Sequence, residues 1–253
     1  MRSNSAMPNA LLGLYTYAEF GICVAAFLPM MGVSHLRHRG DPTQRLPGRW
    51  MRRFGRTASH LTPVWRFSVE GTPPADIGTK AYVVVSNHES QADPFLLSHL
   101  PWDMRWVAKE ELFRIPVIGL LMRFGGDISL RRGSRESVVE MFKECLDTLR
   151  GGVSVMIFPE GTRSPDGNLL PFKDGAFQLA IDAQVPILPI ALAGTRTCRP
   201  KHSKWFGNAE AVAKILEPIP TKGLTSDDLE KLKAGARARI EEALPAMRAR
   251  LWK

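Results

Sequence analysis

His88 and Asp93 are the two residues whose types and spacing most directly suggest chemistry. They stand five residues apart across a predicted bend. The Asp93 carboxylate can therefore accept a hydrogen bond from one imidazole nitrogen and leave the other nitrogen free to take up a proton. This is the orienting half of a catalytic triad without a nucleophile of its own. The pair alone is weak evidence, because the same spacing also arises by chance in a chain of 253 residues.

The elements around the pair place it where α/β proteins usually carry chemistry. An apolar run with strong β preference, residues 82–85, leads into the polar turn, and Pro94 with the apolar residues behind it predicts the start of a helix. A second predicted strand, residues 153–158, also runs straight into a polar turn. The two turns are thus expected at the carboxyl ends of strands. The second turn offers a carboxylate, a flexible glycine and a guanidinium in the residues Pro159, Glu160, Gly161, Thr162 and Arg163.

The two turns together resemble the glycerolipid acyltransferase family, specifically the bacterial 1-acylglycerol-3-phosphate acyltransferases. The resemblance is carried by Asn87-His88-x4-Asp93 and, further on, by Phe-Pro-Glu-Gly-Thr-Arg at residues 158–163. Two weaker blocks follow the family's order, residues 126–133 between the motifs and residues 185–190 after them. The chain departs from the family pattern at Arg131, where an acidic residue is expected.

The resemblance implies transfer of a fatty acyl group from acyl-CoA or acyl carrier protein to the free hydroxyl of 1-acylglycerol-3-phosphate, which makes phosphatidic acid in phospholipid biosynthesis. It implies that His88 is the general base and that Asp93 orients it. No covalent acyl-enzyme is required, because the acceptor is itself the nucleophile, and no Gly-x-Ser-x-Gly elbow is present. The substrate-binding residues implied in this way are Lys109, Arg132, Glu160, Gly161, Thr162 and Arg163.

We expect no metal site and no cofactor beyond the acyl-CoA or acyl carrier protein co-substrate. His88, Glu89 and Asp93 could ligate a metal ion, but no further His or Cys stands at a supporting spacing. The three cysteines are far apart and match neither a disulfide framework nor a metal-ligand spacing. Lys173, at the far end of the loop after Glu160, is a further residue that can face the site.

Three alternative functions remain open. The same chemistry could serve another acceptor, such as lyso-ornithine lipid. The protein could instead be a membrane-bound thioester hydrolase that uses water. It could also be a peripheral membrane-binding protein whose motifs are inactive. Acceptor panels, product analysis and an activity assay distinguish these three functions.

The net charge of +9 implies an anionic partner. Residues 35–66 hold eight arginines against one acid, Asp41, so this segment alone carries +7. A basic cluster directly after an apolar segment is typical of binding to anionic headgroups on the cytoplasmic face of a membrane, at about 1 kcal/mol per charge. Nucleic acid is a poor alternative, because no aromatic-interleaved stripe, recognition-helix pattern or zinc-finger spacing is present.

Residues 10–33 form the only long apolar run, and its length is enough to cross a hydrocarbon core, which needs roughly 20 residues. Glu19, Pro29 and three glycines weaken a lipid-exposed helix. We therefore expect an amphipathic or partly inserted helix, paired with a second helix at residues 47–67. Residues 1–70 would form a membrane-associating helical hairpin on the cytoplasmic face of the bacterial inner membrane. An ordinary helical hairpin packed on the domain is the alternative.

Strand, polar loop and helix alternate through residues 71–253, the expected acyltransferase domain. This alternation predicts an α/β fold with a mixed, mainly parallel sheet flanked by helices. Pro186 and Pro189 predict an edge or bulged position for the strand at residues 185–192. Other strands are expected at residues 104–108, 127–130 and 210–216, and helices at residues 115–124, 134–150, 176–183 and after Thr225.

Overall fold

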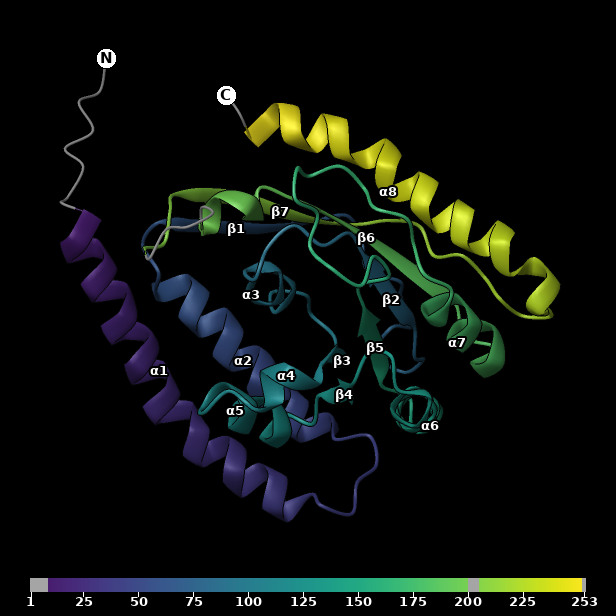
Figure 1. Ribbon diagram of the computed structural model, residues 1–253, viewed down its shortest axis with the longest axis horizontal. Helices are drawn as coiled ribbons and strands as arrows, with labels where there is room; N and C mark the ends of the chain where they lie inside the picture. The colour runs from purple at the N-terminus through teal and green to yellow at the C-terminus, as the bar shows by residue number, and fades with distance from the viewer. Residues whose placement is uncertain (1–8, 200–204, 252–253) are drawn as a thin grey trace.

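Within residues 9–199 and 205–251, which the computed structural model describes, a sheet of seven strands runs through the molecule (Figure 1). The strands are β1 (Trp65–Glu70), β2 (Val83–Ser86), β3 (Met104–Lys109), β4 (Ile128–Leu130), β5 (Ser154–Ile157), β6 (Ile187–Ala193) and β7 (Ala209–Ile215). Their spatial order is β1-β7-β6-β2-β5-β3-β4. Strands β2 to β6 run parallel, whereas β7 is antiparallel to β6 and parallel to β1. The predicted mixed, mainly parallel α/β sheet is confirmed.

Helices cover both faces of the sheet (Figure 1). The helices are α1 (Asn9–Arg37), α2 (Arg45–Leu61), α3 (Asp93–Leu97), α4 (Glu110–Phe113), α5 (Ile118–Phe124), α6 (Arg135–Arg150), α7 (Gly175–Ala183) and α8 (Leu229–Leu251), with short 3₁₀ helices η1 (Thr195–Cys198) and η2 (Ser226–Asp228). Helices α6, α7 and α8 pack on one face, and α2 and α3 on the other. Helix α1 lies outside this second layer, against α2 and α5.

Strand β2 shows how the sequence specifies the two cores. Val83 and Val85 point into one cluster with α6, α7 and α8, and Tyr82 and Val84 point into the other with α3. Successive side chains of a strand face opposite sides, so an unbroken apolar run is buried on both faces. The polar turn after β2 is thereby held at the rigid centre of the sheet.

The expected second helix ends before residue 67, to which it was predicted to run. Helix α2 ends at Leu61, because Thr62 precedes Pro63 and is extended, with φ −71° and ψ 105°. The chain then enters β1, whose Trp65 pairs with Ala209 of β7. The boundary expected at residue 70 would therefore separate β1 from the sheet to which it belongs.

For the strand with two prolines, the edge position predicted as one alternative is wrong, whereas the bulged position predicted as the other is present. Strand β6 lies between β7 and β2 in the middle of the sheet and is buried along its whole length. Ile187 is bridged to Ile219 and Ile190 pairs with Ile215, so the partner chain accommodates one extra residue opposite Pro189. This shift in register lies opposite Pro189, which has no N–H to donate. The interior strand can therefore accommodate the proline.

The helix expected at residues 115–124 begins later than predicted. Pro116 does not open it, because Val117 has a left-handed φ of 66° and the helix α5 starts at Ile118. The resulting turn brings Gly119 so close to α4 that an added Cβ would lie 2.1 Å from the Phe113 carbonyl oxygen. The predicted N-terminal helix at residues 10–33 runs on to Arg37, and the other predicted strands and helices given above agree with the structure within about two residues at each end.

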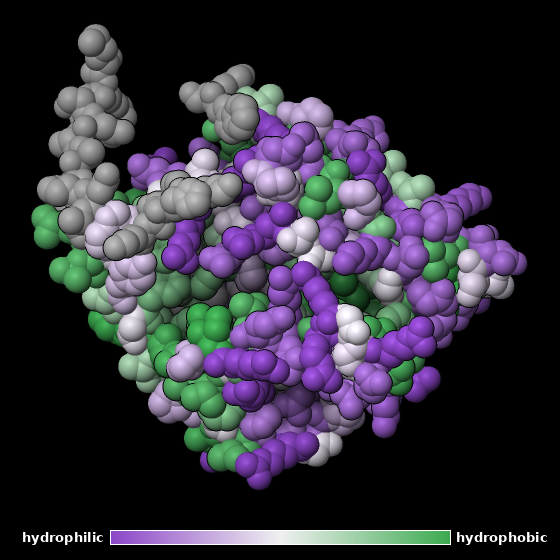
Figure 2. All heavy atoms as spheres, in the orientation of Figure 1, coloured by the Kyte–Doolittle hydropathy of each residue, from purple (hydrophilic) through white to green (hydrophobic). Residues whose placement is uncertain are grey.

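Helix α1 buries polar as well as apolar side chains on its inner face and exposes apolar side chains on its outer face. Thr16, Glu19 and Ser34 are buried, and the Glu19 carboxylate accepts a hydrogen bond from Thr62 Oγ1 at 3.1 Å. Leu14 and Ile22 are 66% and 69% exposed. Figure 2 shows apolar side chains along the edge where α1 lies. Among the described residues, α1 is the helix whose length and composition would allow it to cross a membrane.

Candidate active site

The carboxyl ends of the five parallel strands meet at one edge of the sheet. His88 follows β2, Phe158 follows β5 and Thr195 follows β6, while Lys109 ends β3 and Arg132 follows β4. Neighbouring strands are about 4.8 Å apart, so the ends of β3 and β4 lie about 10 and about 14 Å from the end of β2. The sequence-predicted cations thus flank the histidine on one side of it.

The predicted pairing of His88 with Asp93 is present. The His88 Nδ1 atom lies 2.7 Å from Asp93 Oδ2. An ionised carboxylate only accepts, so Nδ1 carries the proton and Nε2 is left as a proton acceptor. The His88 side chain is 20% exposed and that of Asp93 is fully buried. The imidazole can therefore reach a substrate from a fixed support.

Asp93 is held from four directions. The oxygen that contacts His88 also accepts from the backbone N–H groups of Glu89, at 2.8 Å, and Ser90, at 3.0 Å. The other oxygen accepts from the Thr195 hydroxyl. Thr195 is not among the sequence-predicted site residues. The available signal was a polar residue directly beyond a buried strand.

Phe158 packs on the imidazole. The two rings are stacked with their centroids 4.1 Å apart and their planes 19° from parallel. One face of the imidazole is therefore covered, and its rotation is restricted from β5 while Asp93 restrains it from α3. Phe158 belongs to the second motif, yet the sequence analysis assigned it no role at the site.

Glu160 joins the two turns instead of facing the open edge. It is 3% exposed, and its two carboxylate oxygens accept from the backbone N–H groups of His88, at 2.8 Å, and Leu170, at 3.1 Å. Burial raises the pKa of this carboxyl above its ordinary value. We therefore assign Glu160 a role in shaping the turn in place of the expected direct contact with the substrate.

Two features require glycine at position 161, namely the conformation of its backbone and the closeness of a neighbouring side chain. Its φ is +67°, and an added Cβ would lie 3.1 Å from both Cε and Nζ of Lys173. The Lys173 N–H donates to the Pro159 carbonyl at 2.9 Å, which fixes the lysine beside the turn. Thr162 and Arg163 continue the turn and are exposed.

Several cations at this edge carry no partner within residues 9–199 and 205–251. The exposed side chains of Lys109, Arg132, Arg163 and Lys173 form no hydrogen bond or ion pair there. Arg131 differs from them, because its Nε lies 3.8 Å from Glu110 and its Nη2 contacts the Ser134 hydroxyl. The unpartnered cations are available to an anionic ligand. Within the described residues, no side-chain hydrogen bond or ion pair joins Lys109 or Arg132 to the His88 turn, and their position along the edge is what relates them to it.

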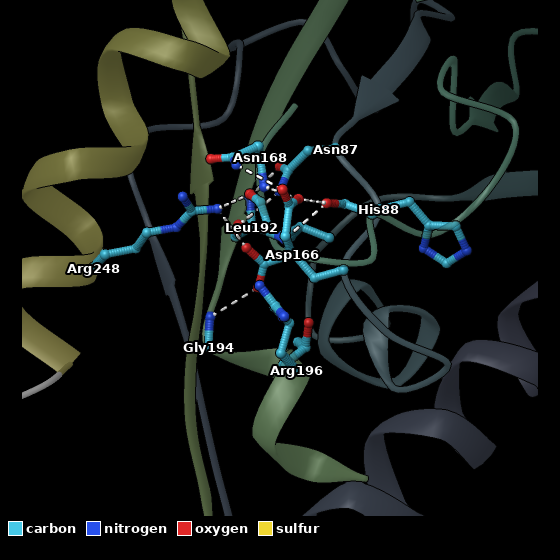
Figure 3. A network of polar contacts seen from close by, with 12 residues as sticks. Asn87, His88, Asp166, Asn168, Leu192, Gly194, Arg196 and Arg248 are labelled. Carbon is cyan, nitrogen blue, oxygen red and sulfur yellow. Dashed lines mark hydrogen bonds and ion pairs between the residues drawn. The ribbon is translucent and has the colours of Figure 1, made fainter. Parts of the chain in front are cut away.

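Asn87 anchors the first turn to β6. Its side-chain amide donates to the Leu192 carbonyl at 2.9 Å, and its oxygen accepts from the Leu192 N–H at 2.8 Å. The amide thus continues the ladder between β2 and β6 just beyond the end of β2. Figure 3 shows this contact and shows that the His88 ring points away from the surrounding polar network.

Glu89 gives the fold a pH dependence. Burial raises the pKa of its carboxyl to about 7, the nearby Asp93 charge adds to the effect, and Arg248 opposes it. Between the ordinary value of 4.5 and about 7, the folded protein holds a proton that the unfolded chain has released. The free energy of unfolding should therefore fall as pH rises through this range. We expect Glu89→Gln to show a smaller difference in Tm between pH 5 and pH 8 than the unsubstituted protein, and equal differences would contradict this assignment.

No group of three or more His, Cys, Asp or Glu side chains within residues 9–199 and 205–251 is arranged to hold a metal ion.

The chain is similar to known acyltransferases in sequence and in structure. A family model described as Acyltransferase matches residues 66–193. A chloroplastic 1-acyl-sn-glycerol-3-phosphate acyltransferase of Arabidopsis thaliana is 31% identical over 239 residues, which cover 94% of this chain and 66% of that protein. The human 1-acyl-sn-glycerol-3-phosphate acyltransferase alpha is 38% identical over 156 residues, which cover 61% and 55%. The chain thus spans between about half and two thirds of these relatives.

A solved structure extends the similarity to almost the whole chain. The crystal structure of the 1-acyl-sn-glycerophosphate (LPA) acyltransferase PlsC from Thermotoga maritima superposes with a TM-score of 0.70 at 29% identity. The match covers 92% of this chain and 95% of that protein.

Proposed function

Because the chain belongs to the acyltransferase family, we propose that it transfers a fatty acyl group from a thioester to the free hydroxyl of 1-acylglycerol-3-phosphate. The product is phosphatidic acid. The observation that carries the proposal is the 2.7 Å contact between His88 Nδ1 and Asp93, at an edge of the sheet where Arg163 has no partner in the described chain. The similarity to 1-acyl-sn-glycerol-3-phosphate acyltransferases in sequence and in structure supports this choice of acceptor.

His88 is the general base in this proposal. Its Nε2 removes the proton from the acceptor hydroxyl as that oxygen attacks the thioester carbonyl carbon. The carbon–sulfur bond then breaks, and the leaving thiolate takes the proton back from the imidazolium. Asp93 holds the required tautomer and stabilises the imidazolium charge. The products are the new ester and a free thiol, so no covalent acyl-enzyme is needed.

Arg163 is the principal phosphate ligand in this proposal, with Lys109 and Arg132 further along the edge. A guanidinium binds phosphate through two parallel N–H donors. Arg163 follows β5, the strand next to β2, so its turn lies about 5 Å from the turn that carries His88. That separation suits an acceptor whose reacting hydroxyl and phosphate belong to one glycerol unit. Thr162 and Gly161 complete the turn that presents the arginine.

Replacing Arg163 with alanine should raise the KM for the acceptor by about 10- to 100-fold with a much smaller change in kcat, because a charge-assisted hydrogen bond contributes about 1.5–3 kcal/mol. Initial rates over a range of lysophosphatidic acid concentrations measure both constants. Arg114→Ala is the matched control, since Arg114 is also exposed but pairs with Glu110 at 3.0 Å. An unchanged acceptor KM with normal turnover would reject Arg163 as a phosphate ligand.

A membrane surface is the second partner in the proposal. The apolar outer face of α1 would lie in the bilayer interface, with the protein monotopic or single-spanning on the cytoplasmic face of the bacterial inner membrane. Exposed apolar patches of this extent mark interaction sites. The arginine cluster contributes less than its sequence suggests, because Arg45, Arg49 and Arg52 converge on Asp103. The exposed arginines left for anionic headgroups are Arg37, Arg39, Arg53, Arg56 and Arg66.

The acyl donor is acyl-CoA or acyl carrier protein, with no other cofactor. Purified protein in vesicles, supplied with lysophosphatidic acid and each donor in turn, should form phosphatidic acid and one free thiol per product. Turnover should persist after addition of a chelator. Omission of the acceptor should stop thiol release. Thiol release at an undiminished rate without acceptor would identify a hydrolase, and transfer only to lyso-ornithine lipid would change the acceptor.

A further inference from the structure

The C-terminal helix reaches the active-site edge through one arginine. Leu232, Ala236, Ile240 and Leu244 pack α8 against the core, which the amphipathic sequence of this helix explains. Arg248 extends from the last turns of α8 toward the polar network beside the site (Figure 3). Its Nη2 donates to Glu89 Oε1 at 2.9 Å and to the Gly167 carbonyl at 2.6 Å. One guanidinium nitrogen therefore joins two loops that are far apart in the sequence.

The first of these loops is the turn that carries His88. Glu89 follows His88 directly, and its side chain is only 3% exposed. Its second carboxylate oxygen accepts from the Gly194 N–H at 3.2 Å, at the end of β6. Glu89 thus ties the histidine turn both to the sheet and to α8. Its backbone N–H is one of the donors to Asp93, so a displacement of residue 89 would also disturb the carboxylate that orients His88.

The second loop begins at Arg163. The next residue, Ser164, donates its N–H to the His88 carbonyl at 2.9 Å, and its hydroxyl accepts from the Gly167 N–H at 2.8 Å. Residues 164–167 therefore form a closed turn, with Arg248 bound at its far end. The loop that presents Arg163 is fixed to the histidine turn at Ser164 and again through Arg248.

We propose that Arg248 is a positioning residue for acyl transfer, which acts through Glu89 and Gly167 to fix the distance between the His88–Asp93 turn and the loop that carries Arg163. This inference rests on the proposed function, since it assumes that both loops handle the same acceptor. An error of about 1 Å in such a distance can cost about 100-fold in rate. Helix α8, which packs on the sheet, then contributes directly to the geometry of the reaction.

Two substitutions on the same helix separate this role from a general effect of α8. Arg248→Met removes the donor but keeps an unbranched apolar stem of similar length. Arg250→Met is the matched control, because Arg250 pairs at 2.8 Å with Glu70 of β1, and both side chains are more than a third exposed. We expect Arg248→Met to raise the acceptor KM and to lower kcat, with a combined loss in kcat/KM of about 10- to 100-fold. Arg250→Met should remain within about 2-fold of the unsubstituted protein, as exposed ion pairs contribute little.

A double variant tests whether a loss of stability explains the loss in kcat/KM. Arg248→Met leaves the buried Glu89 carboxylate without its counter-charge and is expected to lower Tm. The double variant Arg248→Met/Glu89→Met replaces the pair with apolar side chains, a change that is often neutral for stability. We expect Tm to recover while kcat/KM stays at least about 10-fold low, and Arg248→Lys, which keeps a donor, to recover part of kcat/KM. Recovery of activity together with Tm would overturn the proposal.

The activity of the unsubstituted protein completes the experiment, with His88→Ala as the inactive reference. If the unsubstituted protein transfers no acyl group to lysophosphatidic acid, the proposed function fails. If it does transfer, and Arg248→Met behaves like Arg250→Met in both kcat and KM, the positioning role alone fails. The two failures are therefore distinguishable within one set of assays.

Discussion

Replacing His88 with alanine is expected to lower kcat/KM for acyl transfer by about 10²- to 10⁴-fold, the range that a general base contributes. The expected loss is large because the contact of Nδ1 with Asp93 leaves Nε2 of this imidazole free to accept the proton. The fold should survive. The His88 side chain is partly exposed, and its backbone keeps the contacts with Glu160 and Ser164.

Initial rates and thermal unfolding of the His88→Ala protein measure the two parts of this expectation. His60→Ala is a suitable control, since His60 is exposed on α2 and its ring packs on that of His99. A His88→Ala protein that keeps a tenth of the original activity would refute the assignment of the base.

Asp93→Asn is expected to reduce kcat by about 10³- to 10⁴-fold, comparable to the loss when the aspartate of a serine-protease triad becomes asparagine. The asparagine amide can donate to Nδ1, and this favours the tautomer whose proton sits on Nε2, where the acceptor hydroxyl must be deprotonated. In that orientation the amide nitrogen also faces the N–H groups of Glu89 and Ser90, which donate to the same Asp93 oxygen as His88 and would lose their acceptor. A moderate loss of stability is therefore expected beside a large loss of rate.

Thr195→Val tests the specificity of that effect. It removes the donor to the other oxygen of Asp93 but leaves the carboxylate in place. We expect a loss in kcat of less than about 100-fold, because a hydrogen bond to a charged group contributes about 1.5–3 kcal/mol. Nitrogen chemical shifts of the His88 ring report the tautomer directly. Normal turnover by Asp93→Asn would be incompatible with the orienting role.

Local patterns predicted those parts of the site that lie close together in the sequence. His88 and Asp93 occupy one turn, and the apolar run before them specifies a central strand through burial on both faces. The parallel arrangement of β2 and β5 then brings the second motif alongside the first. These relations follow from strand periodicity and from the alternation of strands with helices, both of which a sequence displays.

Contacts between distant segments could not be predicted in the same way. Thr195 reaches Asp93 across 102 positions and Arg248 reaches Glu89 across 159. Neither contact leaves a periodic signal. Strand β6 also misled local reasoning, since Pro189 argues against an interior strand unless the partner's extra residue is known. The charge sum of the arginine-rich segment likewise gave no sign that Asp103 neutralises part of it.

The packing of α1 bears on how the protein can be engineered. Phe20 of this helix contacts Trp65 and Phe95, with ring centroids 6.2 and 5.4 Å apart, and Phe95 stands two positions beyond Asp93. Truncation of the N-terminus to obtain a detergent-free protein would therefore expose an aromatic cluster that includes Phe95, two positions after the orienting acid. Solubility is better improved by replacing the outward-facing apolar residues of α1 with polar ones and keeping Phe20 and Glu19. The proposed membrane contact would then be removed without loss of the packing next to the catalytic turn.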